Sequence, residues 1–236
     1  MLNNNLSLYD IIQYTENNDN LVNVIPAKRI MIISPHQDDE VIGCGGTILK
    51  YLQMSTDIII LYITDGRYGR ILNADRNIEA MEAWNGYNVN QIFLLYEDSH
   101  INENCISDFI NLLLKYKPEI IFIPWLLDNH IDHRNVNIFL SKAIKKTSLN
   151  SIISMYEVLY PLYVNKLVNI TNEFNEKSKI LDIYTSQIGY LNLQNITKEM
   201  NVLRAMLLRL KSIKYAEAFC VTNQTNYLML IEKIFN

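Results

Sequence analysis

Short, strongly apolar segments recur along this chain, and amphipathic segments separate them. The segments "RIMIIS" (29–34), "DIIILYIT" (57–64), "QIFLLY" (91–96) and "EIIFIPW" (119–125) are continuous apolar runs without polar alternation. Runs of this kind are typical of strands that are buried on both faces of a sheet. A segment with helical spacing follows each run, so that strand and helix alternate at about 30 residues per unit. This alternation predicts an open, parallel sheet.

The fold class that we predict is α/β: a Rossmann-like, three-layer fold with a mostly parallel central sheet and helices on both faces. Four helices are expected after the four strands, at 41–53, 73–87, 106–117 and 133–146. The C-terminal third is less regular, with a strand expected at 151–160 and helices at 176–188 and 195–215. We find no repeat and no linker, so we expect one domain over residues 1–236. Residues 1–28 would form an Asn-rich N-terminal extension with a short helix near 6–14.

Composition excludes several classes of function. The net charge is -4 and the pI is about 5.6, which gives no broad basic surface for nucleic acid. No apolar run approaches the roughly 20 residues that a membrane span needs. The three cysteines are widely spaced, which argues against a disulfide scaffold. The N-terminal sequence lacks the pattern of a signal peptide, so we expect a cytoplasmic protein; whether it forms a homo-oligomer is left open.

Polar residues gather directly after the predicted strands, in three clusters. The first is "SPHQDDEVIGCGG" (34–46), the second is "TDGRYG" (64–69), and the third is "DNHIDH" (128–133). In open α/β sheets ligands bind outside the carboxyl ends of the strands. We therefore expect the three clusters to meet at one edge of the sheet and to form the functional site.

The first and third clusters contain three of the four histidines of the chain. Imidazole and carboxylate groups suit Zn²⁺, with Fe²⁺ or Co²⁺ as alternatives. A hydrolytic zinc site uses three protein ligands and keeps one position open. His36 and Asp39 are three residues apart and supply two ligands, and either His130 or His133 would supply the third. A cation also explains why three consecutive acids stand together, because it stabilises their charged forms.

The remaining polar residues then have roles in catalysis. Asp38 could take a proton from water bound to the metal. The histidine that does not bind metal could stabilise an oxyanion or protonate a leaving amine. Asp132 could orient one of the histidines.

Other interpretations of these motifs are less well supported. Either cluster alone could be a solvated polar loop, but two clusters at one edge of the sheet favour a site. The glycines of "GCGG" could cradle a phosphate, yet the Lys-Ser/Thr pair of a P-loop is missing. Cys44 could act as a nucleophile, although the neighbouring acids would raise the pKa of its thiol.

The motifs resemble those of the PIG-L or LmbE-like N-deacetylase family. "SPHQDDEVIGCGG" resembles its P-H-P-D-D-E motif followed by a pair of glycines, and "HIDH" (130–133) resembles its H-P-D-H motif. "TDGRYG" and "RNIEAMEAWNGY" (76–87) are similar to its T-D-G segment and its R-x-x-E-A helix. "KSKILDIYTSQI" (177–188) and "YAEAF" (215–219) match motifs nearer the C-terminus.

The resemblance implies a hydrolase that removes the N-acetyl group from an amino sugar, such as an N-acetylglucosamine conjugate, and depends on Zn²⁺ or sometimes on Fe²⁺. A protein that keeps the fold but only binds metal or sugar is the alternative. The resemblance assigns the metal to His36, Asp39 and His133, the general base to Asp38, and the oxyanion or acid role to His130 with Asp132 behind it. It also places sugar contacts at Arg76 and Asp98. Gln37 and Ile131 replace the usual prolines, and Arg67 stands where several members carry an acid, so that contacts to the sugar or aglycone would differ there.

Overall fold

A seven-stranded sheet forms the centre of the protein, in the order β3-β2-β1-β4-β5-β7-β6. The computed structural model describes residues 23–67, 75–187 and 192–235. Strands β1 to β5 pair in parallel, whereas β7 runs antiparallel to both β5 and β6. The strands are β1 (Arg29–Ser34), β2 (Asp57–Thr64), β3 (Asn90–Tyr96), β4 (Ile120–Pro124), β5 (Ile152–Tyr156), β6 (Lys166–Asn169) and β7 (Ala216–Asn223).

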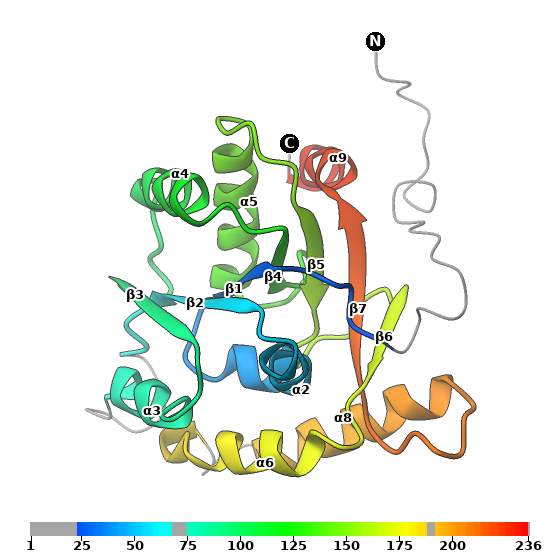
Figure 1. Cartoon of the computed structure of the whole chain (residues 1–236). Coiled ribbons are helices and arrows are strands. Elements are labelled where there is room, and N and C mark those ends of the chain that lie inside the picture. The colour runs from blue at the N-terminus through cyan, green and yellow to red at the C-terminus, as the bar shows by residue number, and fades with distance from the viewer. Residues whose placement is uncertain (1–22, 68–74, 188–191, 236) are drawn as a thin grey trace.

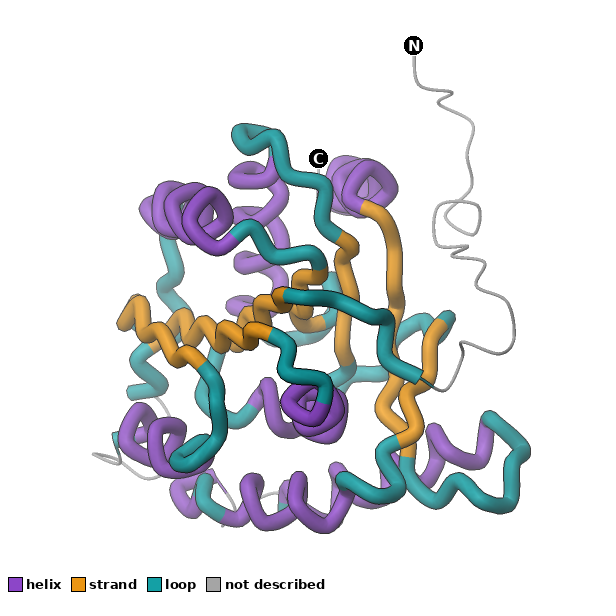
Figure 2. The backbone as a smooth tube through the Cα atoms, viewed as in Figure 1, coloured by secondary structure: helices purple, strands orange, loops and turns teal. Residues whose placement is uncertain are grey.

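Helices cover both faces of the sheet, which confirms the predicted three-layer α/β class (Figure 1). On one face lie α4 (Asn104–Tyr116), α5 (Ile131–Ile144) and α9 (Gln224–Phe235). On the other face lie α2 (Asp39–Gln53), α3 (Arg76–Ala83), α6 (Phe174–Asp182) and α8 (Leu193–Leu207). Figure 2 shows the strands as one twisted layer between these two sets of helices. None of the described helices is both long and apolar enough to cross a membrane.

The two faces of the sheet bury separate cores, and strand β1 contributes to both. Its residues alternate, so that Met31 and Ile33 pack towards α4 and α5 while Ile30 and Ile32 pack towards α2. All four side chains are at most 1% exposed. This is why the segment is apolar throughout: a central parallel strand has no face in water.

The strand order places a topological switch point between β1 and β4. From β1 the chain proceeds outward to β2 and β3, and then returns to β4 on the other side of β1. The loops that follow β1 and β4 therefore diverge towards opposite faces and leave a crevice between them. The polar clusters at 34–46 and 128–133 lie at these two strand ends.

The N-terminal two thirds of the chain follows the prediction more closely than the rest. The bounds of β1 and β2 agree with the apolar runs, and β5 lies within the expected strand at 151–160. The helix expected at 195–215 ends instead at Leu207, because Arg209 adopts a left-handed conformation with φ of 54°. Strands β6 and β7 and helix α9 were not anticipated. The helix expected near 6–14 lies outside the described residues.

Candidate active site

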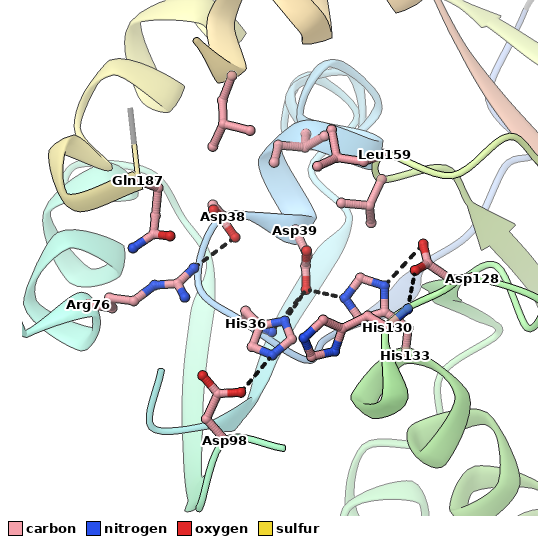
Figure 3. A pocket seen from close by; sticks show the side chains of 13 residues that line it. His36, Asp38, Asp39, Arg76, Asp98, Asp128, His130, His133, Leu159 and Gln187 are labelled. Carbon is pink, nitrogen blue, oxygen red and sulfur yellow. Dashed lines mark hydrogen bonds and ion pairs between the residues drawn. The ribbon is translucent and has the colours of Figure 1, made fainter. Parts of the chain in front are cut away.

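A cavity of about 330 Å³ opens at the switch point. Residues from the loops after β1 and β4 and from α2 and α5 form its polar floor (Figure 3). The segments after β3, β5 and α6, together with the first residues of α3 and α8, complete the walls. The lining consists of His36, Asp38, Asp39, Ile42, Arg76, Asp98, Asp128, His130, His133, Val158, Leu159, Gln187 and Leu193. Of the three polar clusters expected to meet here, the first and the third line the cavity, whereas none of the described residues of the second (64–67) does.

The carboxylate of Asp39 lies between two histidine rings. Its Oδ2 atom is 3.2 Å from Nδ1 of His36 and 3.2 Å from Nε2 of His133. The same oxygen accepts a hydrogen bond of 2.9 Å from the backbone N–H of His36, which fixes the turn between β1 and α2. All three side chains are at most 10% exposed. Two imidazoles and one carboxylate thus face one another.

The opposite ring nitrogen of each of these histidines faces a further carboxylate. Nε2 of His36 is 3.2 Å from Oδ2 of Asp132 and 3.3 Å from Oδ1 of Asp98. Nδ1 of His133 is 3.2 Å from Oδ2 of Asp128. Histidines that bind metals almost always place their second nitrogen against such a carboxylate or carbonyl group, which fixes the tautomer and the ring orientation. This arrangement fits a divalent metal held by His36, Asp39 and His133.

Two sets of donor atoms in the described part of the chain lie close enough together to hold a metal ion. One set belongs to His36, His130 and His133, and the other to His36, Asp98, His130 and Asp132; the atoms in each lie within 4.8 Å of one another. A cluster that could bind metal is therefore present. Asp39 is in neither set, so its place as a ligand rests on the 3.2 Å contacts and stays a prediction.

The charges of the cluster perturb its titration strongly. Burial lowers the pKa of His36, but hydrogen bonds with Asp132, Asp39 and Asp98 outweigh it and raise the pKa well above the usual value. His133 behaves similarly, because the charge of Asp39 and the contact with Asp128 raise its pKa to about 9 against the effect of burial. Burial raises the pKa of Asp39, yet His133 and His36 hold it well below its usual range. Without a cation, protons on the imidazoles balance the carboxylates; a metal would take the place of those protons.

Asp38 stands beside the cluster in a strained conformation. Its φ of 131° is rare for a residue other than glycine, and its carbonyl accepts the first hydrogen bonds of α2, from Val41 and Ile42. Nη2 of Arg76 donates to Oδ1 of Asp38 over 2.9 Å. Burial raises the pKa of Asp38 to about 7, and the charge of Arg76 opposes this rise. A carboxyl group with this pKa can exchange a proton near neutral pH.

Glu40 holds the turn that carries Asp38. Its side chain is fully buried and accepts hydrogen bonds on both oxygens. Oε1 accepts from Tyr62 (3.0 Å), Trp84 (3.0 Å) and Tyr184 (2.6 Å). Oε2 accepts from the hydroxyl of Ser34 (3.0 Å) and from the backbone N–H of Asp38 (3.2 Å). These contacts tie the strained turn to β1, β2, α3 and the segment after α6.

His130 lies at the mouth of the cavity, and its ring centroid is 4.5 Å from that of His36. It precedes α5, and its Nδ1 accepts a hydrogen bond of 3.2 Å from the backbone N–H of Asp132. Burial and the neighbouring charges of His36 and His133 lower the pKa of His130. A neutral ring that accepts at Nδ1 carries its proton on Nε2. His130 can therefore donate a hydrogen bond into the cavity.

The residues expected to contact the sugar occupy different positions. Asp98 lines the cavity next to His36; burial raises the pKa of Asp98, but the contact with His36 outweighs it and lowers the pKa to about 2. Arg76 also lines the cavity but is only 5% exposed and is bound to Asp38. Arg67 does not line it, and its guanidinium pairs with Asp65 and Glu97. Gln187 also lines the cavity. It belongs to the segment "KSKILDIYTSQI" and had no predicted role.

The glycines of α2 serve close packing. A Cβ atom at Gly43 would lie 2.2 Å from the ring of Tyr156, and one at Gly46 would lie 2.7 Å from Ile170. Helix α2 could not approach the sheet and the segment after β6 so closely with larger residues. This packing accounts for the "GCGG" sequence without a phosphate.

Known proteins resemble this chain in sequence and in fold. Together, the fold and the cavity define an α/β protein with a candidate metal centre at the switch point of its sheet. The model of the family described as "PIG-L: GlcNAc-PI de-N-acetylase" matches residues 31–144, the part of the chain that contains both motifs. The predicted family resemblance is thereby confirmed over this segment.

Three known proteins illustrate the similarity. The diacetylchitobiose deacetylase of Thermococcus kodakarensis is 28% identical over 52% of this chain and 51% of its own length. The structure of the N,N'-diacetylchitobiose deacetylase of Pyrococcus horikoshii aligns with a TM-score of 0.75 and 24% identity, and covers 93% of this chain and 91% of that chain. The 4-carboxy-2-hydroxymuconate hydratase GalB of Pseudomonas putida aligns with a TM-score of 0.70 and 16% identity, and covers 83% and 95%.

The curated relatives match this chain over only part of their length. The chain spans about half the length of the first curated relative and less of the others. A hydratase shares the fold, so the fold alone does not fix the reaction.

Proposed function

We propose that this protein is a metal-dependent N-deacetylase. It would hydrolyse the linear amide bond of an N-acetylated amino sugar, such as an N-acetylglucosamine conjugate, and release acetate and a free amine. The observation that carries this proposal is the position of Asp38, a buried carboxyl group with a pKa near 7, beside the cluster of His36, Asp39 and His133. A general base next to a three-ligand cation site is the arrangement that hydrolysis of an unactivated amide needs.

His36, Asp39 and His133 would hold the metal, with Zn²⁺ or Fe²⁺ as the candidates. A cation bound there supplies Lewis-acid polarisation of the amide carbonyl and makes water more acidic. Asp128 and Asp132 keep the two ligand rings in place through the opposite nitrogens.

Proton transfer is assigned to Asp38. It removes a proton from the attacking water and returns it to the nitrogen of the leaving amine as the C–N bond breaks. Arg76 limits the rise of the pKa of Asp38 and fixes the direction of its carboxylate. His130 donates from Nε2 to the oxygen of the tetrahedral intermediate. Asp98, charged at neutral pH, would accept hydrogen bonds from sugar hydroxyls, and Arg67 would act outside the cavity on a longer aglycone.

The cellular setting forms part of the same proposal. All three cysteines are free and buried, which suits a reducing compartment such as the cytoplasm. The partner is a small amino-sugar substrate.

The proposal is tested by measuring acetate release from a panel of N-acetylglucosamine conjugates, together with the metal content of the purified protein. Wild type and Asp38→Asn are compared on every substrate. Stoichiometric metal with acetate release only by wild type supports the proposal. Metal or sugar binding without release by either form would indicate the non-catalytic alternative, and equal rates for both would refute the role of Asp38.

A further inference from the structure

The end of α8 and the turn after it carry large apolar side chains in water. Leu203, Met206, Leu207 and Leu210, here called the α8 patch, are 53%, 69%, 52% and 51% exposed. The opposite face of the helix is buried through residues such as Asn201 and Ala205. Figure 1 shows this end of α8 reaching past the edge strand β6. The spacing of Leu203, Met206 and Leu207 places them on one face of the helix, and large exposed apolar surface usually marks an interaction site.

A groove of about 550 Å³ runs beside the α8 patch and is strongly basic. Met206 and Leu210 line it together with three cations, Arg209, Lys211 and Lys214, and no lining residue is acidic. The sequence from 200 to 216 contains no Asp or Glu, although the whole chain has a net charge of -4. Positive charge is thus concentrated where the apolar side chains are exposed.

The backbone conformation of Arg209 supports a role for the positive charge of the groove. Arg209 has φ of 54°, in the left-handed region, directly after the end of α8. Glycine is the favoured residue at this position after a helix because it has no Cβ. An arginine there accepts a backbone cost and places its side chain in the groove.

Two kinds of surface could cover the α8 patch, a second copy of the chain or a lipid surface, and the positive charge favours one of them. In a symmetric pair of copies the same patch faces itself, so the cations of both copies would be brought together, at a cost. An anionic lipid surface instead offers negative head groups to the cations and an apolar boundary to the leucines and the methionine. We propose that the α8 patch and its groove dock the protein onto an anionic membrane surface.

The docking surface is separate from the cavity. Helix α8 begins at Leu193, which lines the cavity, and ends in the patch. Its 15 residues separate the two by about 22 Å along the helix axis. Substitutions in the patch therefore leave the cavity lining intact, and the inference does not depend on the proposed deacetylase activity.

Co-sedimentation of the full chain with vesicles tests the proposal. One set of vesicles contains phosphatidylcholine alone, and the other contains phosphatidylcholine with phosphatidylglycerol. We expect the anionic vesicles to bind at least about tenfold more protein, and high salt to weaken this binding because it screens the cations. Equal binding to both kinds of vesicle, or none to either, would overturn the proposal.

Two variants connect the binding to the α8 patch. Met206→Gln/Leu207→Gln removes exposed apolar surface while keeping good helix propensity, and we expect it to abolish most of the binding. Arg209→Gly removes one cation and relieves the left-handed backbone, so it should bind about fivefold more weakly, the factor for about 1 kcal/mol per cation, without a fall in Tm. Leu114→Gln is the matched control, because Leu114 is 50% exposed on α4, across the sheet.

Light scattering after gel filtration tests the main alternative, in which a second copy of the chain covers the α8 patch. If Met206→Gln/Leu207→Gln converts an oligomer to a monomer, the patch is an interface between copies, and the membrane proposal is wrong. Binding that both variants leave unchanged would equally refute it, because the lipid would then be bound elsewhere on the chain.

Discussion

Replacement of Glu40 by glutamine should destabilise the protein strongly, although the side chains are nearly the same size. Glu40 accepts hydrogen bonds on both oxygens, and each oxygen faces a group that can only donate. At Oε1 this group is the indole N–H of Trp84, 3.0 Å away, and at Oε2 it is the backbone N–H of Asp38, 3.2 Å away. The amide nitrogen that Glu40→Gln introduces must face one of them, so the conflict cannot be relieved by turning the side chain.

The size of the effect follows from the bonds that are lost. A hydrogen bond to a charged group contributes about 1.5 to 3 kcal/mol. The substitution removes the charge and breaks one or two such bonds, which gives a loss of about 1.5 to 6 kcal/mol. This is a large part of the roughly 5 to 15 kcal/mol by which proteins are stable.

Urea unfolding followed by circular dichroism measures this loss. Glu79→Gln is the control, because only one oxygen of Glu79 accepts from a backbone N–H, that of Ser186. The other oxygen accepts from the Ser186 hydroxyl, which can rotate to accept from an amide nitrogen, and Glu79 is only partly buried. We expect a smaller loss for the control. If Glu40→Gln unfolds within about 1 kcal/mol of wild type, the Glu40 network does not hold the turn, and our account of the strained Asp38 fails with it.

Four further outcomes are expected. Asp38→Asn should lower kcat/KM for acetate release by about 10²- to 10⁴-fold and leave the metal content unchanged. Removal of metal with a chelator should abolish acetate release and lower Tm, because metal binding stabilises the folded state, and Zn²⁺ or Fe²⁺ should restore both. Asp132→Asn should weaken metal affinity by about 10- to 100-fold in a metal titration; an unchanged affinity would exclude Asp132 as the support of a ligand. Lys177→Met should cost about 3 to 5 kcal/mol in urea unfolding, because it leaves the buried charge of Glu217 without its 2.7 Å partner. Lys177→Met/Glu217→Leu should not recover this loss, because Glu217 also accepts from the buried backbone N–H groups of Gly46 and Thr47 over 2.8 Å, and the double variant leaves both unpaired.

The central part of the fold could be predicted because its local pattern and its environment agree. Strands β1 and β2 are buried on both faces, so their sequences are apolar throughout and their ends are sharp. Strand β7 is different: its sequence AEAFCVTN contains Glu217, which is buried and paired with Lys177 from α6. A buried ion pair between distant segments interrupts the apolar pattern that reveals a strand, and this explains why β7 was missed.

The site could be anticipated for a related reason. His36, Asp38 and Asp39 follow β1, and His130 and His133 follow β4, and parallel strands bring their carboxyl ends to one edge. The order of the strands determines which loops meet but not which side chains are in contact. Arg67 illustrates the limit, since it follows β2 at the same edge but pairs with Asp65 and does not line the cavity.

The partner of Asp132 shows the same limit within one motif. The sequence left open which histidine Asp132 orients, and the family resemblance placed it behind His130, yet its Oδ2 is 3.9 Å from Nδ1 of His130 and 3.2 Å from Nε2 of His36. Residues two apart at the start of a helix do not face each other, and His130 is already bound to the backbone N–H of Asp132. The side chain of Asp132 therefore points across the switch point to the histidine of the other motif. Each cluster thus supplies the carboxylate or the histidine that the other needs, and neither could form the candidate metal site alone.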